Sequence, residues 1–340
     1  MENFVSPPFN RPITIGNRVI ENRLALAPLT KLGNVAFREL LSEYGGYGLL
    51  FSEMCGARRL PHENRRTSPI FRWRDEEIGK LSWQIVGTDP SDMADAARRI
   101  ENEGFFGVDI NFGCSVAAIC RHSGGAALLK QPDTATRIVS AVRKAVSIPV
   151  TVKFRTGWQD DPLPAVRLAR RFESAGADAL TFHPRVAPDR RSRPPRWEYI
   201  GKVKDAVTIP VFGNGDVFTL ADGDRMMEQT GCDGIALGRI AVAKPWIFAE
   251  WMGTHQPEPD CYKKVVFRLI KLLERHFDPQ RALGRFKKFA FYFSANFRFG
   301  HTLYSGIQNA PDLETAKAAA EKFFLHPPSV TTHPNRNFFT

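Results

Sequence analysis

Eight short, strongly apolar runs recur along the chain between residues 24 and 239, and they constrain the fold more than any other feature. The runs are LALAP, GLLFSE, SWQIVG, GVDINFG, VTVKFR, ALTFHP, PVFGNGD and GIALGR. Each is too apolar to leave one face in water, which is typical of parallel strands covered on both faces. Stretches such as SDMADAARRIENEG and DTATRIVSAVRKAV separate several of the runs, and their apolar spacing of three to four residues indicates helices.

Alternation of this kind predicts an α/β fold, a closed (β/α)8 TIM barrel. The alternative is an open, doubly wound sheet. The usual GxGxxG fingerprint of that fold is missing after the first strand, where the sequence is LALAPLTKLGN.

After Trp246 the alternation stops and the sequence becomes helical in character. The segments KKVVFRLIKLLERHF, RALGRFKKFAFYFSANF and LETAKAAAEKFF predict three helices, and QPEPD within residues 255–260 supplies a break before them. We therefore predict a barrel domain at residues 1–252 and a small helical domain at residues 261–330.

Composition restricts the setting in which this chain works. A hydrophobic content of 43% in 340 residues is enough for a large core, and no apolar run approaches the roughly 20 residues that span a bilayer. The N-terminus, MENFVSPPFNRP, lacks the features of a signal peptide. We expect a cytoplasmic monomer without a membrane partner.

The five cysteines form no CxxC pair, so we expect free thiols and no bound metal.

The formal net charge of +11 favours a polyanionic partner such as nucleic acid. Two segments concentrate arginines, the first with Arg58, Arg59, Arg65, Arg66, Arg72 and Arg74, and the second with Arg185, Arg190, Arg191, Arg193 and Arg196. A third basic segment, residues 281–301, interleaves its cations with phenylalanines that could stack on bases. The alternative for this segment is a helix whose aromatic rings face the core while its cations face water.

Polar side chains stand where the apolar strands end, which is where barrels of this kind carry their active sites. Strands three to six supply four such residues, Gln84, Asn111, Lys153 and His183. Together they suit a flavin ring, which needs amide partners at its pyrimidine edge and a cation near a carbonyl. The alternatives are a structural salt bridge for Lys153 and a hydrogen-bonded core position for His183.

The last two strands end in residues that suit a phosphate. These are Asn214, Gly215 and Asp216 after the seventh strand, and Gly238 and Arg239 after the eighth. Barrels commonly bind phosphate at this position with backbone amides and a helix N-terminus. The alternatives are a simple tight turn for NGD and a surface ion pair for Arg239.

Cys114 ends the fourth strand and precedes a glycine-containing loop in DINFGCSVAAICRHSGGAALL. A free thiol has a pKa of about 8.5 and is mostly protonated at neutral pH, so Cys114 could donate a proton as well as attack. The alternative is a small buried hydrophobe. Cys120 and His122 follow in the same loop, but their spacing matches no standard zinc site.

These motifs resemble those of the tRNA-dihydrouridine synthases, most closely the DusB type. The similarity runs from ITIGNRVIENRLALAP through SEM, DINFGC, KFRTGW and GNGD to GRIAVAKPWIF and the C-terminal helices. It implies an enzyme that binds FMN in the barrel, uses NADPH as reductant and reduces a uridine of tRNA to 5,6-dihydrouridine. It also implies that the helical domain binds tRNA.

The resemblance carries over to individual residues. It implies that Pro28 and Leu29 line the flavin, that the four polar residues of strands three to six hold its ring and ribityl chain, and that the residues of strands seven and eight hold its phosphate. Cys114 would protonate carbon 5 of the uracil while hydride reaches carbon 6, and Arg185 would contact the substrate. The chain differs from the family on the substrate side, with Ser115 in place of the proline of GCP and HPRVAPDRRSR in place of HGRTR.

Two other functions are consistent with the same residues. One is an FMN-dependent TIM-barrel oxidoreductase acting on a small molecule, which would not explain the arginine-rich segments. The other is a catalytically inactive RNA-binding relative, which would carry no flavin.

Overall fold

The computed structural model describes residues 9–189 and 193–339. The chain forms two compact units. Unit 1 comprises the residues up to Pro28 together with Tyr47–Leu237, and unit 2 comprises Leu29–Gly46 together with the residues from Gly238 onward.

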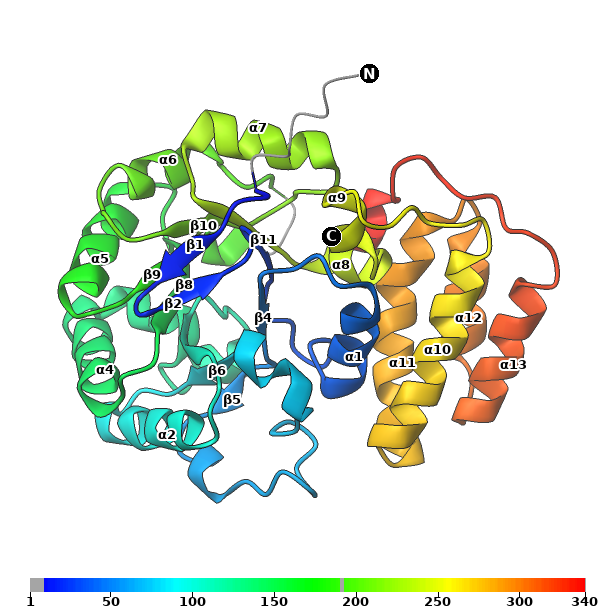
Figure 1. Ribbon diagram of the computed structural model, residues 1–340, viewed down its shortest axis with the longest axis horizontal. Coiled ribbons are helices and arrows are strands. Elements are labelled where there is room, and N and C mark those ends of the chain that lie inside the picture. Colours follow the sequence, from blue (N-terminus) through cyan, green and yellow to red (C-terminus); the bar gives the residue numbers. More distant parts are fainter. Residues whose placement is uncertain (1–8, 190–192, 340) are drawn as a thin grey trace. The chain divides into compact units, whose positions relative to one another are not determined.

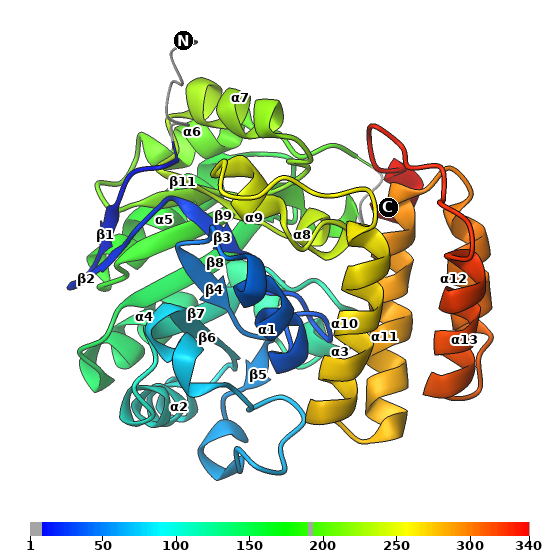
Figure 2. The same cartoon turned by 45° about the vertical axis from the view of Figure 1, so that its right-hand side comes forward.

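Unit 1 contains a closed barrel of eight parallel strands (Figures 1 and 2). The strands are β3 (Leu24–Leu26), β4 (Leu49–Phe51), β6 (Leu81–Val86), β7 (Gly107–Phe112), β8 (Val150–Gly157), β9 (Ala179–Val186), β10 (Val211–Gly213) and β11 (Gly234–Leu237). Their order is β4-β3-β11-β10-β9-β8-β7-β6, and the pairing of β4 with β6 closes the ring. A short strand, β5 (Cys55–Gly56), pairs with β6. All eight predicted runs are strands, so the predicted TIM barrel is confirmed.

Helices surround this barrel (Figure 1). They are α2 (Pro90–Asn102), α3 (Ala117–Cys120), α4 (Pro132–Ala145), α5 (Leu163–Ser174), α6 (Glu198–Lys204) and α7 (Leu220–Thr230). The two amphipathic stretches quoted from the sequence correspond to α2 and α4. In α2 the buried side chains include Met93, Ala97 and Ile100, at the spacing expected of one helix face, and Asp89 caps its N-terminus.

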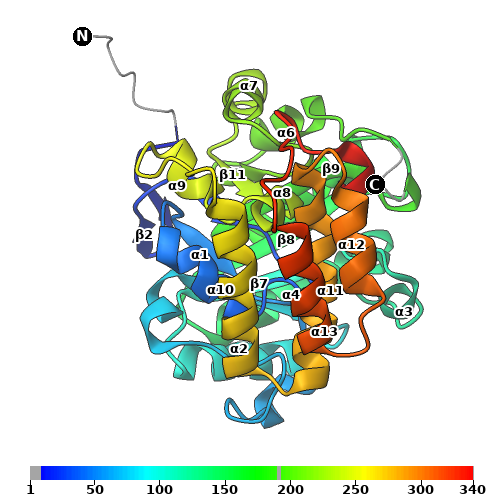
Figure 3. The same cartoon turned by 90° about the vertical axis from the view of Figure 1, so that its right-hand side faces the viewer.

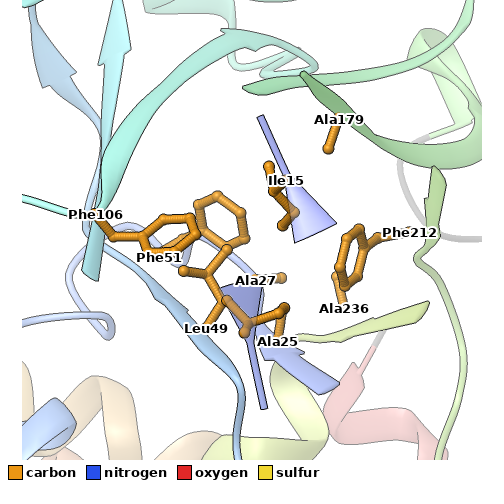
Figure 4. Packing of buried hydrophobic residues seen from close by; sticks show 10 residues of the cluster. Ile15, Ala25, Ala27, Leu49, Phe51, Phe106, Ala179, Phe212 and Ala236 are labelled. Carbon is orange, nitrogen blue, oxygen red and sulfur yellow. The ribbon is translucent and has the colours of Figure 1, made fainter. Parts of the chain in front are cut away.

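A hairpin that the sequence patterns did not predict covers the end of the barrel where the strands begin. Its strands are β1 (Ile13–Ile15) and β2 (Arg18–Ile20), paired antiparallel. Arg18 donates a 2.8 Å hydrogen bond to the carbonyl of Phe105, just before β7. Ile15 is fully buried among Phe106, Ala179 and other barrel residues (Figure 4). The opposite end, where the strands finish, carries the polar residues.

Unit 2 is helical. Its helices are α1 (Val35–Tyr44), α8 (Arg239–Ala243), α9 (Ile247–Trp251), α10 (Cys261–His276), α11 (Pro279–Phe293), α12 (Gly300–Gln308) and α13 (Leu313–Phe323). The last four pack side by side (Figure 3). The sequence predicted three C-terminal helices after the break, and it missed α12. This helix buries few apolar side chains, among them Leu303 and Ile307, so its sequence has no clear apolar repeat.

Packing within unit 2 uses both apolar and charged contacts. Glu39 of α1 is buried and accepts hydrogen bonds from Arg275 (2.9 Å) and His276 (2.6 Å) of α10. A buried carboxylate with two partners avoids the cost of an unpaired charge. The predicted domain limits, 1–252 and 261–330, stay a prediction. The break at residues 255–260 does separate α9 from α10, but the two compact units divide the chain elsewhere.

Most aromatic rings of the third basic segment face the core of unit 2. Phe286, Phe289, Phe293 and Phe297 are buried, and the rings of Phe289 and Phe293 stack with centroids 4.9 Å apart. The interpretation of these rings as base-stacking surfaces is therefore wrong, and the core-facing alternative is confirmed for them. Phe299 is different, since 58% of it is exposed.

Within residues 9–189 and 193–339, every helix is too short or too polar to cross a membrane.

Candidate active site

The register of neighbouring strands places the predicted polar residues side by side. Gln84 on β6 pairs with Asp109 on β7, and Asn111 on β7 pairs with Lys153 on β8. His183 follows on β9. Because all strands of a parallel barrel end at the same side, these side chains share one rim. The structure thus brings Gln84, Asn111 and Lys153 together as the sequence predicted.

Hydrogen bonds join the side chains of β6 and β7 into a chain. The Gln84 amide nitrogen donates to Asp109 Oδ2 (2.6 Å), and the Asn111 amide nitrogen donates to Gln84 Oε1 (2.8 Å). Asn111 Oδ1 in turn accepts the backbone N–H groups of Gly113 (3.1 Å) and Cys114 (2.9 Å). Sequence reasoning gave no role to Asp109. Its signal was an aspartate inside an otherwise apolar strand, a position that requires hydrogen-bond partners.

Burial perturbs the two charged groups of this rim in opposite ways. It raises the pKa of Asp109 to about 6, against the opposing effects of hydrogen bonds from Thr151 and Gln84 and of the Lys153 charge. It lowers the pKa of Lys153 to about 8, and the nearby charge of Arg155 adds to this shift.

Lys153 makes its hydrogen bond to a neutral group. Its Nζ donates to Asn214 Oδ1 (3.2 Å), which links β8 to the turn after β10. Among the described residues no carboxylate lies within 4.0 Å of this nitrogen, so the alternative of a structural salt bridge is wrong there. A partly accessible ammonium at the rim is therefore available to a ligand that can accept a hydrogen bond.

The turn after β10 is tight and rigidly held. Asn214 donates to the carbonyl of Ala236 (2.6 Å), and the indole N–H of Trp197 donates to the carbonyl of Gly215 (2.9 Å). Gly215 has φ +126°, and a Cβ there would lie 2.9 Å from Cδ2 of His183. Only glycine fits this close approach to His183. The tight-turn alternative describes the local backbone correctly and is compatible with phosphate binding by its amides.

Arg185 is 4% exposed, and its guanidinium donates to Asp216 Oδ2 at 2.8 Å. Asp216 itself has φ +50°, a left-handed conformation that aspartate tolerates better than most residues. The pair neutralises the carboxylate beside the turn. The substrate-binding role of Arg185 stays a prediction, but its charge is already engaged within unit 1.

Cys114 is partly exposed in a loop that is held at both sides of the residue. Its N–H is bound by Asn111, and its carbonyl accepts the N–H of Ala126 (2.8 Å) and faces Cys120 Sγ at 3.5 Å. Gly125 has φ +58°, and a Cβ there would lie 2.5 Å from the Cys114 carbonyl oxygen. All five cysteines are free thiols, and Cys55, Cys232 and Cys261 are buried. The buried-hydrophobe alternative therefore does not describe Cys114.

Four further predicted residues lie at the division between the units. Pro28 follows β3 and belongs to unit 1, whereas Leu29, Gly238 and Arg239 belong to unit 2. Gly238 caps α8, and Arg239 is its first residue, with its guanidinium 5.8 Å from the ring of Phe339. The roles of all four toward a flavin stay predictions.

Many arginines of the two basic segments are paired with carboxylates, some of them near in the sequence and some distant. Arg65 lies 2.6 Å from Asp75, and Arg196 pairs with Asp160. Arg193 makes a longer pair with Asp189. Arg190 and Arg191 lie outside the described residues. Arg58 and Arg66 are exposed.

The fold and the rim together define a (β/α)8-barrel enzyme with a thiol, amides and a lysine at its strand ends. The chain belongs to the dihydrouridine synthase (Dus) family, whose model matches residues 25–323. It is 37% identical over 240 residues to probable tRNA-dihydrouridine synthase 1 of Synechocystis sp., covering 71% of this chain and 67% of that protein. It is 38% identical over 238 residues to tRNA-dihydrouridine synthase B of Pseudomonas aeruginosa, covering 70% and 71%.

Solved structures with the same fold are more distant. Morphinone reductase has a TM-score of 0.51 and 15% identity, covering 76% of this chain and 94% of that one. The old yellow enzyme from Trypanosoma cruzi has a TM-score of 0.55 and 13% identity, covering 76% and 96%. 2-Naphthoyl-CoA reductase has a TM-score of 0.55 and 14% identity. The match covers 72% of this chain and about half (52%) of that longer one. At such identities the likeness concerns the fold alone.

Family membership gives the class of reaction. The chain is an oxidoreductase of tRNA modification with tRNA-dihydrouridine synthase activity. The family implies a flavin cofactor and a tRNA substrate.

Proposed function

We propose that this chain reduces a uridine of tRNA to 5,6-dihydrouridine, with FMN as the flavin and NADPH as the reductant. The single observation that carries the proposal is the joined rim of Gln84, Asn111 and Lys153 beside the loop of Cys114. Family membership supplies the reaction class, and the rim supplies residues suited to it.

The residues of the rim fit a flavin. Two side-chain amides and an ammonium are donors and acceptors of the kind that the edge of a flavin ring requires. At the Gly215 turn a side chain would be excluded, and the pairing of Asp216 with Arg185 reduces repulsion of a phosphate. Bound FMN supplies the two electrons that reduce the 5,6 double bond of uracil.

Cys114 acts as the general acid in this proposal. Its thiol holds a proton at Sγ and transfers it to carbon 5 of the uracil. The backbone of Cys114 is fixed through both its N–H and its carbonyl, so the thiol starts from a defined position.

Lys153 and Asn111 stabilise the negative charge that develops on the uracil oxygen or on the ring beneath it. A pKa of about 8 leaves Lys153 mostly protonated at pH 7. A cation that is already partly desolvated before the reaction interacts more strongly with developing charge than a fully solvated one.

Exposed groups on each unit suit contact with tRNA. Arg58 and Arg66 of unit 1 are exposed cations. In unit 2 the exposed ring of Phe299 lies beside Arg298, whose guanidinium is 5.6 Å from the ring centroid. An aromatic ring next to a cation can stack on a base and contact a phosphate. Such contacts offset the few kcal/mol needed to extrude a uridine from a folded RNA.

The decisive experiment maps dihydrouridine in RNA from cells with and without this chain, together with the absorbance spectrum of the pure protein. We expect a flavin spectrum and the loss of dihydrouridine at a tRNA position. Protein without flavin would instead support the inactive RNA-binding relative. Bound flavin with unchanged dihydrouridine, and tRNA binding that does not weaken with salt, would support an enzyme acting on a small molecule.

A further inference from the structure

The buried carboxylate of Asp109 determines which group donates and which accepts in a series of hydrogen bonds. A carboxylate accepts but does not donate, so it must receive the NH2 group of Gln84, and the Gln84 oxygen must then face away from it. That oxygen accepts from the NH2 group of Asn111 at 2.8 Å. The Asn111 oxygen is consequently turned toward the loop, where it accepts two backbone N–H groups.

The other end of the series is anchored as well. Thr151 on β8 donates its hydroxyl to Asp109 Oδ1 at 2.7 Å, so both carboxylate oxygens have a partner. The backbone N–H of Gln84 donates to the Ser52 hydroxyl at 2.8 Å, which fixes the start of its side chain. Asp109 is fully buried and Gln84 is 1% exposed, so water does not compete for these bonds.

From this geometry we propose that Asp109 is a positioning residue that, through Gln84 and Asn111, holds the loop carrying Cys114. The importance of Cys114 in catalysis rests on the proposed function, whereas the mechanical link from Asp109 to the loop does not. The Asp109 carboxylate bonds to Gln84 and Thr151 and not to the described loop residues, so it acts by setting the orientation of the Gln84 and Asn111 amides.

The test replaces Asp109 with leucine, which has the same number and branching of side-chain heavy atoms and cannot accept a hydrogen bond. Amide hydrogen exchange of a peptide covering residues 112–116 is measured in the holoenzyme, together with the rate at which iodoacetamide alkylates Cys114. We expect D109L to raise the exchange of the Gly113 and Cys114 amides by about tenfold, because an Asn111 amide without a fixed direction opens more often. The rate of alkylation should change as well.

Turnover provides a readout that a merely destabilised protein would not give. Reduction of the flavin by NADPH needs no thiol, so in D109L it should slow clearly less than uridine reduction, which should slow by about tenfold at an unchanged KM for tRNA. V108A is the matched control, because Val108 is fully buried on the same strand and its side chain takes no part in the hydrogen bonds. It should destabilise the protein without changing loop exchange.

A double variant keeps the proposal testable if D109L folds poorly. D109L/Q84L removes both partners of the Gln84–Asp109 hydrogen bond, which is generally better tolerated than removing one. Its loop exchange should equal that of Q84L alone, because Asp109 has no route to Asn111 once Gln84 is gone. Additive effects of the two substitutions would overturn the proposal, as would a D109L loop that exchanges like that of V108A. If wild-type protein makes no dihydrouridine, the proposed function fails, and loop exchange still decides the role of Asp109.

Discussion

The rim of the barrel and the arginine-rich segments are both polar, but the fold determines them in different ways. At the rim, the positions of Gln84, Asn111 and Lys153 follow from strand register, which a repeating apolar pattern reveals. In the arginine-rich segments, the state of a charge depends on whether the fold brings a carboxylate to it, as when Arg185 meets Asp216. Residue type therefore predicts chemistry well where the backbone is regular and poorly where ion pairing decides it.

Replacing Cys114 with alanine is the strongest test of the rim. We expect uridine reduction to slow by about 100-fold or more, the range found when a general acid is lost, while flavin remains bound. The measurement is single-turnover reduction of tRNA uridine by the prereduced enzyme. C120A is the control, because Cys120 lies in the same loop and its Sγ faces the Cys114 carbonyl. This variant removes a thiol from the loop and keeps the thiol of Cys114. Equal loss in both variants would mean that the loop, and not the Cys114 thiol, limits the rate.

The perturbed charge of Lys153 gives a test by pH. Below pH 8 the lysine is protonated in both the folded and the unfolded state. In this range, burial of the charged ammonium lowers the free energy of unfolding by its full amount. Between pH 8 and 10.5 the folded state loses this proton first, so the cost falls as pH rises. Relative to K153M, the flavin-free wild type should gain about 2 kcal/mol of unfolding free energy between pH 7 and pH 10. Urea denaturation at the two pH values measures this, and a constant difference would contradict the shift.

Replacing Arg185 with alanine tests whether a paired arginine can act at a distance. The change leaves Asp216 without this partner beside the predicted phosphate turn, so FMN should bind about tenfold more weakly. Fluorescence titration of FMN measures the affinity. The salt dependence of tRNA binding should stay as in wild type, and a reduced salt slope would instead place Arg185 on the RNA.

Replacing Arg66 with alanine tests an exposed arginine and should have the smallest effect. We expect tRNA affinity to fall about threefold and the slope of log K against log salt to decrease by about 0.7 to 0.9, as for one lost phosphate contact. R196A serves as the comparison, because Arg196 is already paired with Asp160. Filter binding at several salt concentrations would show both effects, and equal losses in the two variants would remove the distinction between paired and exposed arginines.

The sequence predicted the eight strands because each is a continuous apolar run, and it predicted the rim because polar residues ended those runs. It did not predict the hairpin β1–β2, whose strands have three residues each. The position of Asp109 was visible, but its link to Cys114 required knowing how β6 and β7 pair. The rings of Phe289 and Phe293 could face either core or solvent until the packing of α11 was known.

The hairpin β1–β2 has a kinetic consequence. The hairpin, with Ile15 and Ile20 buried, covers the end of unit 1 where the strands begin, so a molecule that binds at the polar rim approaches it from the opposite end. In the proposed function, NADPH and the tRNA uridine both react with the flavin. Because both would reach it from the same end of the barrel, they would bind in turn. Such a shared entrance is expected to give double-displacement kinetics, seen as parallel lines in double-reciprocal plots.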